Sequence, residues 1–403
     1  MQILYNIGIL LLRTGIGIAT IFNSKAKDWV SGRKAQFKNL PDTSGKKVIW
    51  FHCASLGEFD QGLPLMHKLK SEYPSVFLLV TFFSPSGMKF YKKREHRSDH
   101  VMYLPLDTKK NARRFMHHFK PTKAFFVKYE FWSNFIFEAK KSGSKIYNVS
   151  GIFRSDHRFF KWYGGFFRKT LRAFDSFFVQ NEESKKLLES IGLNKVYITG
   201  DSRFDRVIEN KKNATQNEII AAFKNDEPLL IIGSSWPADE KIILPWINSQ
   251  KGKVLIAPHN VTNENVNNLL TSLSDSLCYT KAEISNVGDK KVLILDTMGQ
   301  LANAYLYGTI AYVGGGFSGK LHNILEPAVF GLPVIFGPKH QRFPEAQNFI
   351  DKGIGYSVDS TETFDSIFKQ LTQSLEEVSI ETIKFVEQNQ GAANRIYTHI
   401  TSS

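Results

Sequence analysis

Short, continuous apolar runs recur along this chain, and each is followed by a turn and a helical pattern. A run without polar alternation is typical of a strand that is buried on both faces in a parallel sheet. The pattern predicts an α/β fold with two doubly wound, Rossmann-like domains facing each other across a cleft. The expected strands cover residues 47–52, 76–82, 101–104, 124–128, 146–148, 177–180, 196–199, 229–233, 254–257, 292–295, 310–313 and 333–336.

The length of 403 residues also favours two domains, because it exceeds what one hydrophobic core usually holds. A segment rich in asparagine and lysine around residues 210–217 marks the expected linker. We therefore predict an N-terminal helix at 1–24, a first domain at 25–209 and a second at 210–403. Cys53 and Cys278 show no ligand spacing, which is typical of reduced thiols in a cytosolic protein.

The formal net charge of +14 favours nucleic acid, an anionic membrane surface or a phosphorylated substrate as the partner. Residues 3–22 are apolar over about the length that spans a bilayer, but Arg13 lies in their middle. The favoured interpretation is a helix on the cytoplasmic leaflet; a single span and a helix packed within the protein stay open. A basic tract follows the apolar segment and is expected to anchor it: Lys25, Lys27, Arg33 and Lys34.

Residues 310–340 hold an apolar strand, the glycines Gly314–Gly316, a helical turn and a second apolar strand. Glycines after a buried strand let a ligand approach the backbone, and a helix start offers free N–H groups to a phosphate. Glu326 would repel a phosphate but could accept hydrogen bonds from ribose hydroxyls. This stretch predicts a nucleotide pocket; the alternative is an ordinary strand–turn–helix, since glycine loops are weak signals.

Charged residues also follow the expected strands of the first half. Glu58 lies at the start of a helix, which would keep its carboxylate ionised for a role as a general base. The alternative for Glu58 is a simple capping carboxylate. Glu130 lies just past the end of the expected strand at 124–128 and would face the same crevice, and Arg203 could hold a phosphate or a carboxylate bidentately.

Residues 153–177 are dense in basic and aromatic side chains. Three interpretations stay open: nucleic-acid stacking, a lipid-gripping surface, or an amphipathic helix with a solvated basic face. The eleven histidines show no paired ligand spacing, and no P-loop, hydrolase elbow or zinc spacing occurs. No metal or other cofactor is therefore expected.

Taken together, the motifs resemble the 3-deoxy-D-manno-octulosonic acid (Kdo) transferases of lipopolysaccharide biosynthesis over nearly the whole chain. The resemblance implies an inverting glycosyltransferase with the GT-B fold, which moves Kdo from CMP-Kdo, a CMP-sugar, to a lipid A precursor such as lipid IVA. It also implies a location at the cytoplasmic face of the cell inner membrane. The matching segments are FHCASLGEFDQGLPL, KYEFWSNFI, NVSGIFRSD, ITGDSRFD, GSSWPADE, APHN, DTMGQLANAY and VGGGFSGKLHNILEPAVFGLPVIFGP.

The resemblance also assigns roles to residues. Glu58 matches the catalytic base, while Glu130 and Arg203 match positions that stabilise the transition state. The first domain is thereby implied to bind the acceptor and the second domain the donor. The segments that match CMP-binding positions contain Pro258, His259, Met298, Gly299, Gln300, Asn323, Ile324, Leu325 and Glu326.

Some positions depart from the family pattern. His259 stands where the family usually has Arg, Arg203 replaces a usual Lys, and Gln300 replaces a usual Glu. Lys128, Tyr129 and Ser133 also differ. These departures affect the expected contacts to the CMP donor more than the expected role of Glu58 as the catalytic base. The competing interpretations are a UDP-sugar GT-B enzyme, including an epimerase, a non-catalytic membrane-surface protein and, least favoured, a nucleic-acid binder.

Overall fold

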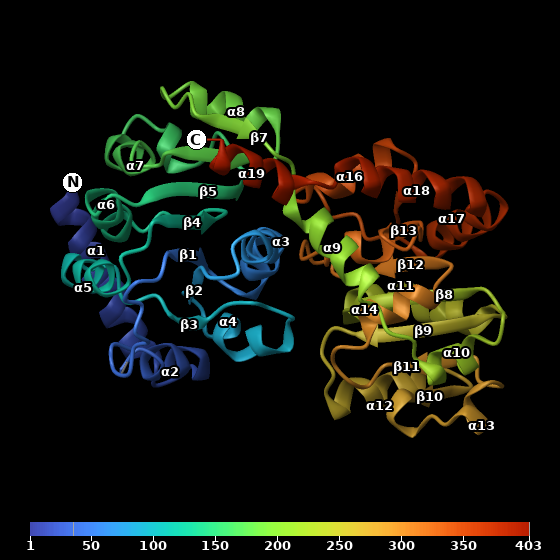
Figure 1. Ribbon diagram of the computed structural model, residues 1–403. Coiled ribbons are helices and arrows are strands. Elements are labelled where there is room, and N and C mark those ends of the chain that lie inside the picture. Colours follow the sequence, from blue (N-terminus) through green and yellow to red (C-terminus); the bar gives the residue numbers. More distant parts are fainter. Residues whose placement is uncertain (35, 403) are drawn as a thin grey trace. The chain divides into compact units, whose positions relative to one another are not determined.

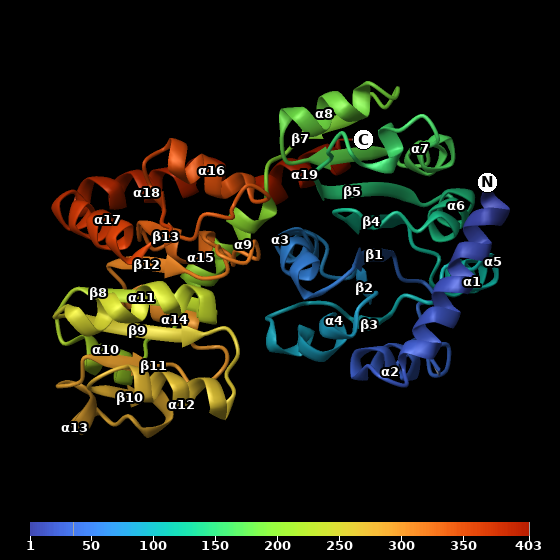
Figure 2. The same cartoon turned by 180° about the vertical axis from the view of Figure 1, so that it is seen from behind.

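The computed structural model describes residues 1–34 and 36–402 and divides into two compact units. The first unit consists of Met1–Arg206 together with Asn389–Ser403, and the second is Val207–Gln388. Figure 1 and Figure 2 show that each unit is built around its own sheet with helices on both faces. The prediction of two doubly wound α/β units is therefore confirmed.

The sheet of the first unit has seven parallel strands in the order β3-β2-β1-β4-β5-β6-β7. The strand order reverses between β1 and β4, and ligands of open α/β sheets bind beyond the carboxyl ends at such a point. The strands are β1 (Val48–Cys53), β2 (Phe77–Phe82), β3 (His100–Tyr103), β4 (Lys123–Val127), β5 (Lys145–Gly151), β6 (Ser176–Val179) and β7 (Val196–Ile198).

Helices cover both faces of this sheet, and a buried hydrophobic cluster lies on each face. One cluster contains Trp50, Phe115 and Phe135. The other contains Phe51, Phe59 and Ile396. The helices of the unit are α3 (Leu56–Glu72), α4 (Pro85–Phe90), α5 (Lys109–Phe119), α6 (Ser133–Lys141), α7 (Gly165–Leu171), α8 (Glu182–Glu189), α9 (Ser202–Lys212), which continues into the second unit, and α19 (Ala392–Thr401).

The second sheet also has seven parallel strands, in the order β10-β11-β9-β8-β12-β13-β14. Its strands are β8 (Leu229–Ser235), β9 (Lys253–Pro258), β10 (Ser276–Cys278), β11 (Val292–Ile294), β12 (Ile310–Val313), β13 (Val334–Phe336) and β14 (Gly355–Ser357). Its helices are α10 (Glu218–Lys224), α11 (Pro237–Ser249), α12 (Asn263–Ser272), α13 (Ile284–Val287), α14 (Leu301–Ala304), α15 (Leu325–Ala328), α16 (Pro344–Asp351), α17 (Thr361–Gln373) and α18 (Leu375–Asn389).

The C-terminal helix α19 differs from the predicted domain division, which placed all residues after 209 in the second domain. It belongs to the first unit, and both views show this red helix beside that unit's strands. Asp205 accepts hydrogen bonds from the N–H groups of Gly391 and Ala393 at 2.5 and 2.7 Å. Lys123 Nζ donates to the carbonyl of Ile400 at 2.7 Å. An amphipathic pattern identifies the apolar face of a helix but not the sheet that this face covers.

Two N-terminal helices, α1 (Gln2–Ala19) and α2 (Ser24–Ser31), pack on the first unit. Arg33, which was predicted to anchor the chain to lipid, is instead tied into the protein. Its guanidinium donates to the carbonyls of Trp29, Phe83 and Leu104 at 3.1, 2.7 and 3.0 Å. Burial lowers the pKa of Arg33 to about 9. The lysines of the predicted tract are exposed.

The basic and aromatic segment at 153–177 is neither one amphipathic helix nor an open stacking surface. It contains a short 3-10 turn at Arg158–Phe160 and the helix α7. Phe153, Phe159 and Phe174 are buried in the core of the first unit. Trp162 differs from them, because 91% of its surface is exposed. Most of the aromatic content of this segment therefore stabilises the fold.

Candidate functional site

The carboxyl edge of the first sheet carries Glu58, on the first turn of α3 after β1. Ser55 donates to Glu58 Oε2 from its backbone N–H at 3.0 Å and also from its hydroxyl, which forms a capping box. Glu58 is thus a capping residue of α3, as the alternative interpretation predicted. Both hydrogen bonds reach Oε2, and no donor among the described residues is seen at Oε1. A half-buried carboxylate held at one oxygen can still accept a proton at the other.

Glu130 follows β4, the strand next to β1. Its Oε2 accepts a hydrogen bond from Trp132 Nε1 at 2.7 Å and lies 3.2 Å from His52 Nε2. Its side chain is 17% exposed. The backbone before it bends sharply, since Lys128 has φ 59°. The amide of Asn148 donates to the Lys128 carbonyl at 2.7 Å, which helps to hold this unfavourable conformation beside a candidate site.

Arg203, on the first turn of α9, is oriented by an acid that the sequence pattern did not predict. Its Nε and Nη2 lie 2.8 and 2.6 Å from Asp201 Oδ2. Burial raises the pKa of Asp201, but the charges of Arg203 and Lys128 and the hydrogen bonds from Arg203 outweigh it and leave the pKa lowered. Asp201 therefore stays ionised and fixes the direction of the guanidinium.

Glu58 and Glu130 follow the paired parallel strands β1 and β4, and their charges act on common neighbours at the carboxyl edge of the sheet. Burial raises the pKa of the Cys53 thiol at the end of β1, and the charges of Glu58 and Glu130 raise it further. Burial also raises the pKa of Tyr129. The charges of Arg154 and Arg203 lower this pKa in part, and the charge of Glu58 raises it. Tyr129 and Arg154 were not predicted as site residues; their position directly after β4 and β5 is the signal that could have identified them.

In the second unit, the loop after β12 confirms the predicted strand and turn but gives the glycines a different role. A Cβ on Gly314 would lie 2.3 Å from the carbonyl oxygen of Ser234, and one on Gly316 would lie 2.4 Å from Gly337 N. Gly315 has φ 91°. These glycines therefore allow close packing of backbone segments, where we predicted room for a ligand.

Asp239, on the first turn of α11, holds this loop in place and was not identified from the sequence. Its carboxylate is fully buried and accepts hydrogen bonds from Trp236 N, Gly315 N and the Tyr312 hydroxyl at 2.9, 2.9 and 2.8 Å. One side chain thus joins the start of α11, the strand β12 and the glycine loop.

The predicted ribose-binding residues lie on the next turn of the chain. Asn323 Nδ2 donates to Glu326 Oε1 at 3.2 Å, and Asn323 Oδ1 accepts from Leu325 N at 3.2 Å. Glu326 is half-buried and lies on the first turn of the four-residue helix α15. Ile324 and Leu325 are buried, so their side chains belong to the core and only their backbone could meet a ligand.

The other predicted donor residues follow β9 and β11, which pair with each other in the same parallel sheet as β12. Pro258 is the last residue of β9 and is buried. In the loop after β11, Met298 is 72% exposed and Gly299 has φ 97°. Gln300 Oε1 lies 3.5 Å from Asn217 Nδ2. The parallel topology therefore brings all predicted donor segments to one edge.

An aromatic stack beside His259 was not predicted from the sequence. The ring of His259 stacks on Trp236 with centroids 4.1 Å apart and lies 4.7 Å from the ring of His322. The pKa of His259 is lowered mainly by burial and to a smaller extent by the charge of Lys320. The pKa of His322 is lowered to about 4, mainly by burial and to a smaller extent by His259. Lys320 Nζ lies 5.3 Å from the centroid of the Trp236 ring. A cation above neutral rings is an arrangement that could receive an anion.

Comparisons with known proteins show what this chain is similar to. A family model described as 3-deoxy-D-manno-octulosonic-acid transferase (kdotransferase) matches residues 31–206. The 3-deoxy-D-manno-octulosonic acid transferase of Rickettsia typhi is 23% identical over 378 residues, which cover 90% of this chain and 80% of that protein. The enzyme of the same name from Chlamydophila psittaci is 28% identical over 333 residues, covering 78% and 75%. Over most of its length this chain is therefore similar to Kdo transferases.

The fold of this chain also matches solved structures. UDP-GlcNAc 2-epimerase from Neisseria meningitidis bound to UDP-GlcNAc superimposes with a TM-score of 0.65 at 17% identity. The match covers 89% of this chain and 100% of that chain. This likeness establishes the GT-B fold and, at such identity, the fold alone.

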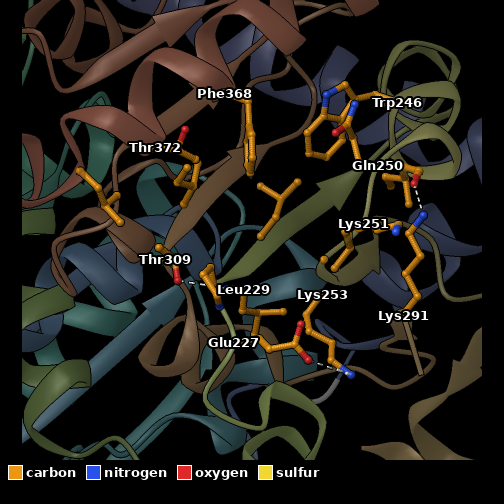
Figure 3. A pocket seen from close by; sticks show the side chains of 17 residues that line it. Glu227, Leu229, Trp246, Gln250, Lys251, Lys253, Lys291, Thr309, Phe368 and Thr372 are labelled. Atoms are coloured by element: carbon orange, nitrogen blue, oxygen red, sulfur yellow. Dashed lines mark hydrogen bonds and ion pairs between the residues drawn. The ribbon is translucent and has the colours of Figure 1, made fainter. Parts of the chain in front are cut away.

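A separate cavity of about 460 Å³ lies at the opposite edge of the second sheet (Figure 3). It is lined by the first residues of β8, β9 and β12, and Trp246 and Phe368 contribute to its walls. The predicted donor residues follow the carboxyl ends of strands, so the apolar cavity is not part of the candidate site. Among the described residues, no cluster of histidine, cysteine and acidic side chains suitable for a metal ion occurs.

Proposed function

We propose that this protein is an inverting glycosyltransferase that moves Kdo from CMP-Kdo to a lipid A precursor such as lipid IVA. The observation that carries the proposal is Glu58, a carboxylate held at one oxygen at the carboxyl edge of a family-matched domain. In this proposal the first unit binds the acceptor and the second unit binds the donor.

The proposed chemistry is a single displacement. Glu58 Oε1 takes the proton of the acceptor hydroxyl as that oxygen attacks the anomeric carbon of Kdo. The bond from this carbon to the phosphate oxygen breaks, and CMP leaves with the electron pair. Attack from the face opposite CMP inverts the configuration. A positioned base of this kind contributes about 10²–10⁴-fold to the rate.

Glu130 and Arg203 are proposed to stabilise the transition state. The anomeric carbon gains positive charge as CMP departs, and a fixed carboxylate such as Glu130 would stabilise it. The leaving phosphate carries negative charge, which a guanidinium oriented by Asp201 could receive. Since the charges are fixed before the reaction, they need not reorganise during it. We propose that no metal is required, so that a chelator such as EDTA would leave the rate unchanged.

Nucleotide binding provides the direct test of the donor class. We expect CMP to raise the unfolding temperature of the protein and UMP to raise it much less, because CMP is the proposed leaving group. A larger shift with UMP or UDP would favour the UDP-sugar alternative, including an epimerase. The support for CMP is the family match together with the ribose-type carboxylate Glu326 beside Asn323.

Lys320 is expected to contribute to donor binding. Its ammonium lies over the Trp236 ring at the edge where His259 replaces the arginine usual in the family. Replacing Lys320 with alanine should weaken CMP binding about tenfold, because a charge-assisted contact to the phosphate would be lost. Calorimetric titration with CMP measures this effect. Lys384→Ala, on an exposed helix of the same unit, should bind CMP like the wild type. Unchanged CMP affinity in the Lys320 variant would exclude the contact.

We further propose that α1 lies in the plane of the cytoplasmic face of the inner membrane. It is the single helix among the described residues that passes a length and composition test for spanning. However, Tyr5 donates to the buried Asp107 at 2.5 Å, and Asn134 Nδ2 donates to Asn6 at 3.0 Å. A spanning helix would enter about 30 Å of hydrocarbon and break these contacts. The support for an in-plane helix is that the side of α1 with Tyr5 and Asn6 is bound to the first unit.

The side of α1 away from these contacts is apolar. Ile3 and Leu11 are 75% and 66% exposed, and Phe22, beyond the end of the helix, is 87% exposed. The exposed Trp162 lies four residues before Phe166, whose ring contacts Tyr5 at 5.3 Å. Aromatic and aliphatic side chains flanked by exposed lysines are suited to an anionic bilayer surface.

Charges on this side of α1 should release the protein from membranes. Replacing Leu4 and Leu11 with glutamate should reduce binding to anionic vesicles by at least about tenfold, because burying two carboxylates in lipid is costly. Sedimentation with vesicles of phosphatidylglycerol and phosphatidylethanolamine measures the bound fraction. Ile380→Glu, at a site 59% exposed on the second unit, is the matched control and should bind normally. Equal binding by all three proteins would rule out α1 as the anchor.

A further inference from the structure

A buried histidine beside Glu130 has no role in the proposed displacement. His52 lies on β1 and is fully buried, and its partner in the register of the neighbouring strand β2 is Thr81. A buried polar ring requires hydrogen-bond partners on both nitrogens. His52 has them: Thr81 at Nδ1 and Glu130 at Nε2.

The contact with Glu130 determines that Nε2 of His52 carries a proton. His52 Nδ1 lies 2.9 Å from the Thr81 hydroxyl and 3.1 Å from the Thr81 carbonyl. Since Trp50 Nε1 donates to this hydroxyl at 2.8 Å, the hydrogen of the hydroxyl can point to a neutral Nδ1, whereas a protonated Nδ1 can donate to the carbonyl. The other nitrogen, Nε2, faces a carboxylate oxygen at 3.2 Å, and two lone pairs would repel there. Two protonation states of His52 avoid this repulsion: the neutral tautomer with its proton on Nε2, and the imidazolium. Both carry a proton on Nε2.

Glu130 is consequently held by two donors at the same oxygen. Trp132 Nε1, at the start of α6, donates at 2.7 Å, and His52 Nε2, on β1, donates at 3.2 Å. Phe126 and Trp132 place their rings 5.9 and 6.5 Å from the His52 ring, which makes the surroundings apolar. Hydrogen bonds to a charged group are stronger in such surroundings than in water.

We propose that His52 is a positioning residue for Glu130. The buried series Trp50–Thr81–His52 presents a proton to the carboxylate, and Trp132 supplies a second one, so that Glu130 keeps its orientation at the carboxyl edge of the sheet. The consequence for catalysis rests on the proposed function, in which Glu130 stabilises the transition state. Displacement of such a group by about 1 Å can cost about 10²-fold in rate.

Two isosteric variants separate this role from simple packing. The side-chain amide of glutamine places its nitrogen near the position of Nε2, so His52→Gln can still donate to Glu130. The amide of asparagine reaches only as far as Nδ1, so His52→Asn keeps a polar group near Thr81 but loses the donor to Glu130. We expect kcat to fall about 10²-fold in His52→Asn and less than about fivefold in His52→Gln, with the KM for CMP-Kdo unchanged in both.

Three further measurements complete the test. His118→Asn, which removes a hydrogen bond to the carbonyl of Pro41 elsewhere in the first unit, should leave kcat unchanged. Thr81→Val, which nearly conserves volume, should also lower kcat, because it removes the hydroxyl at Nδ1 and leaves only the carbonyl at 3.1 Å, an acceptor that favours a proton on Nδ1 over one on Nε2. In a Glu130→Gln background His52→Asn should cause little further loss, because the interaction is already altered.

The outcomes distinguish this proposal from the proposed function. Wild-type kcat in His52→Asn, or equal losses in the asparagine and glutamine variants, would overturn the positioning role while Glu130→Gln remains impaired. Full activity of Glu130→Gln would instead remove Glu130 from the mechanism and this role of His52 with it. If His52→Asn fails to fold, Thr81→Val decides: normal kcat in that variant contradicts the proposal.

Discussion

Replacing Glu58 with glutamine should lower kcat for Kdo transfer by about 10²–10⁴-fold, because the variant cannot take the proton from the acceptor hydroxyl. The fold should survive, since the glutamine oxygen can still accept the hydrogen bond that Ser55 N–H gives to Glu58 at 3.0 Å. CMP binding should be unchanged, because the proposed donor residues lie in the second unit. Glu58→Ala should lose transfer equally and cost an additional ~1 kcal/mol of stability, since the capping box is lost.

A control on the same helix makes this result specific. Glu72 ends α3, is exposed and pairs with Lys68 at 2.7 Å. Glu72→Gln changes the net charge of the protein by the same amount but should keep full activity. Turnover within a few-fold of the wild type in Glu58→Gln would show that another group takes the proton.

Replacing Asp239 with alanine should destabilise the protein more than any other substitution proposed for it. Three donors lose their partner at once: Trp236 N, Gly315 N and the Tyr312 hydroxyl. Each buried donor without a partner costs about 1–3 kcal/mol, partly offset by the removal of a buried charge, so we expect a loss of about 3–5 kcal/mol in the second unit. CMP binding should be lost as well, because the glycine loop is released.

Urea unfolding combined with CMP titration measures both effects. Asp365 is the matched control, since it accepts a hydrogen bond from Trp246 Nε1 at 3.0 Å but is 29% exposed on α17. Asp365→Ala should cost less than about 1 kcal/mol and leave CMP affinity intact. If Asp239→Ala unfolds at the same urea concentration as the wild type, the loop does not depend on this carboxylate.

The strands and the fold class could be predicted from the sequence because parallel strands are buried on both faces. The run at residues 310–313 is one example, and the structure has β12 at Ile310–Val313. Weak signals were missed: β10 and β14 have three residues each and lie at the sheet edges. The helix α19 was assigned to the wrong domain, because its partners, including Asp205, are distant in sequence.

The candidate site was predictable only as far as strand ends indicate a shared edge. Glu58 and Glu130 lie at the carboxyl edge of the first sheet, and the donor segments lie at the carboxyl edge of the second sheet, because each sheet is parallel. Side-chain partners were not predictable, because each depends on three-dimensional packing. Asp201 holds Arg203, and His52 contacts Glu130 from another strand. The glycines after β12 show the same limit, since a close backbone neighbour such as Ser234 and a ligand leave the same signature in the sequence.

The central claim is that this protein moves Kdo from CMP-Kdo to a lipid A precursor. Its most direct test is incubation of the purified full chain with CMP-Kdo and lipid IVA in mixed micelles, followed by mass spectrometry of the lipid. We predict that the lipid gains the mass of one or more Kdo residues while CMP is released, and that Glu58→Gln gives no such product. An unmodified lipid after incubation with folded, CMP-binding wild-type protein would contradict the claim.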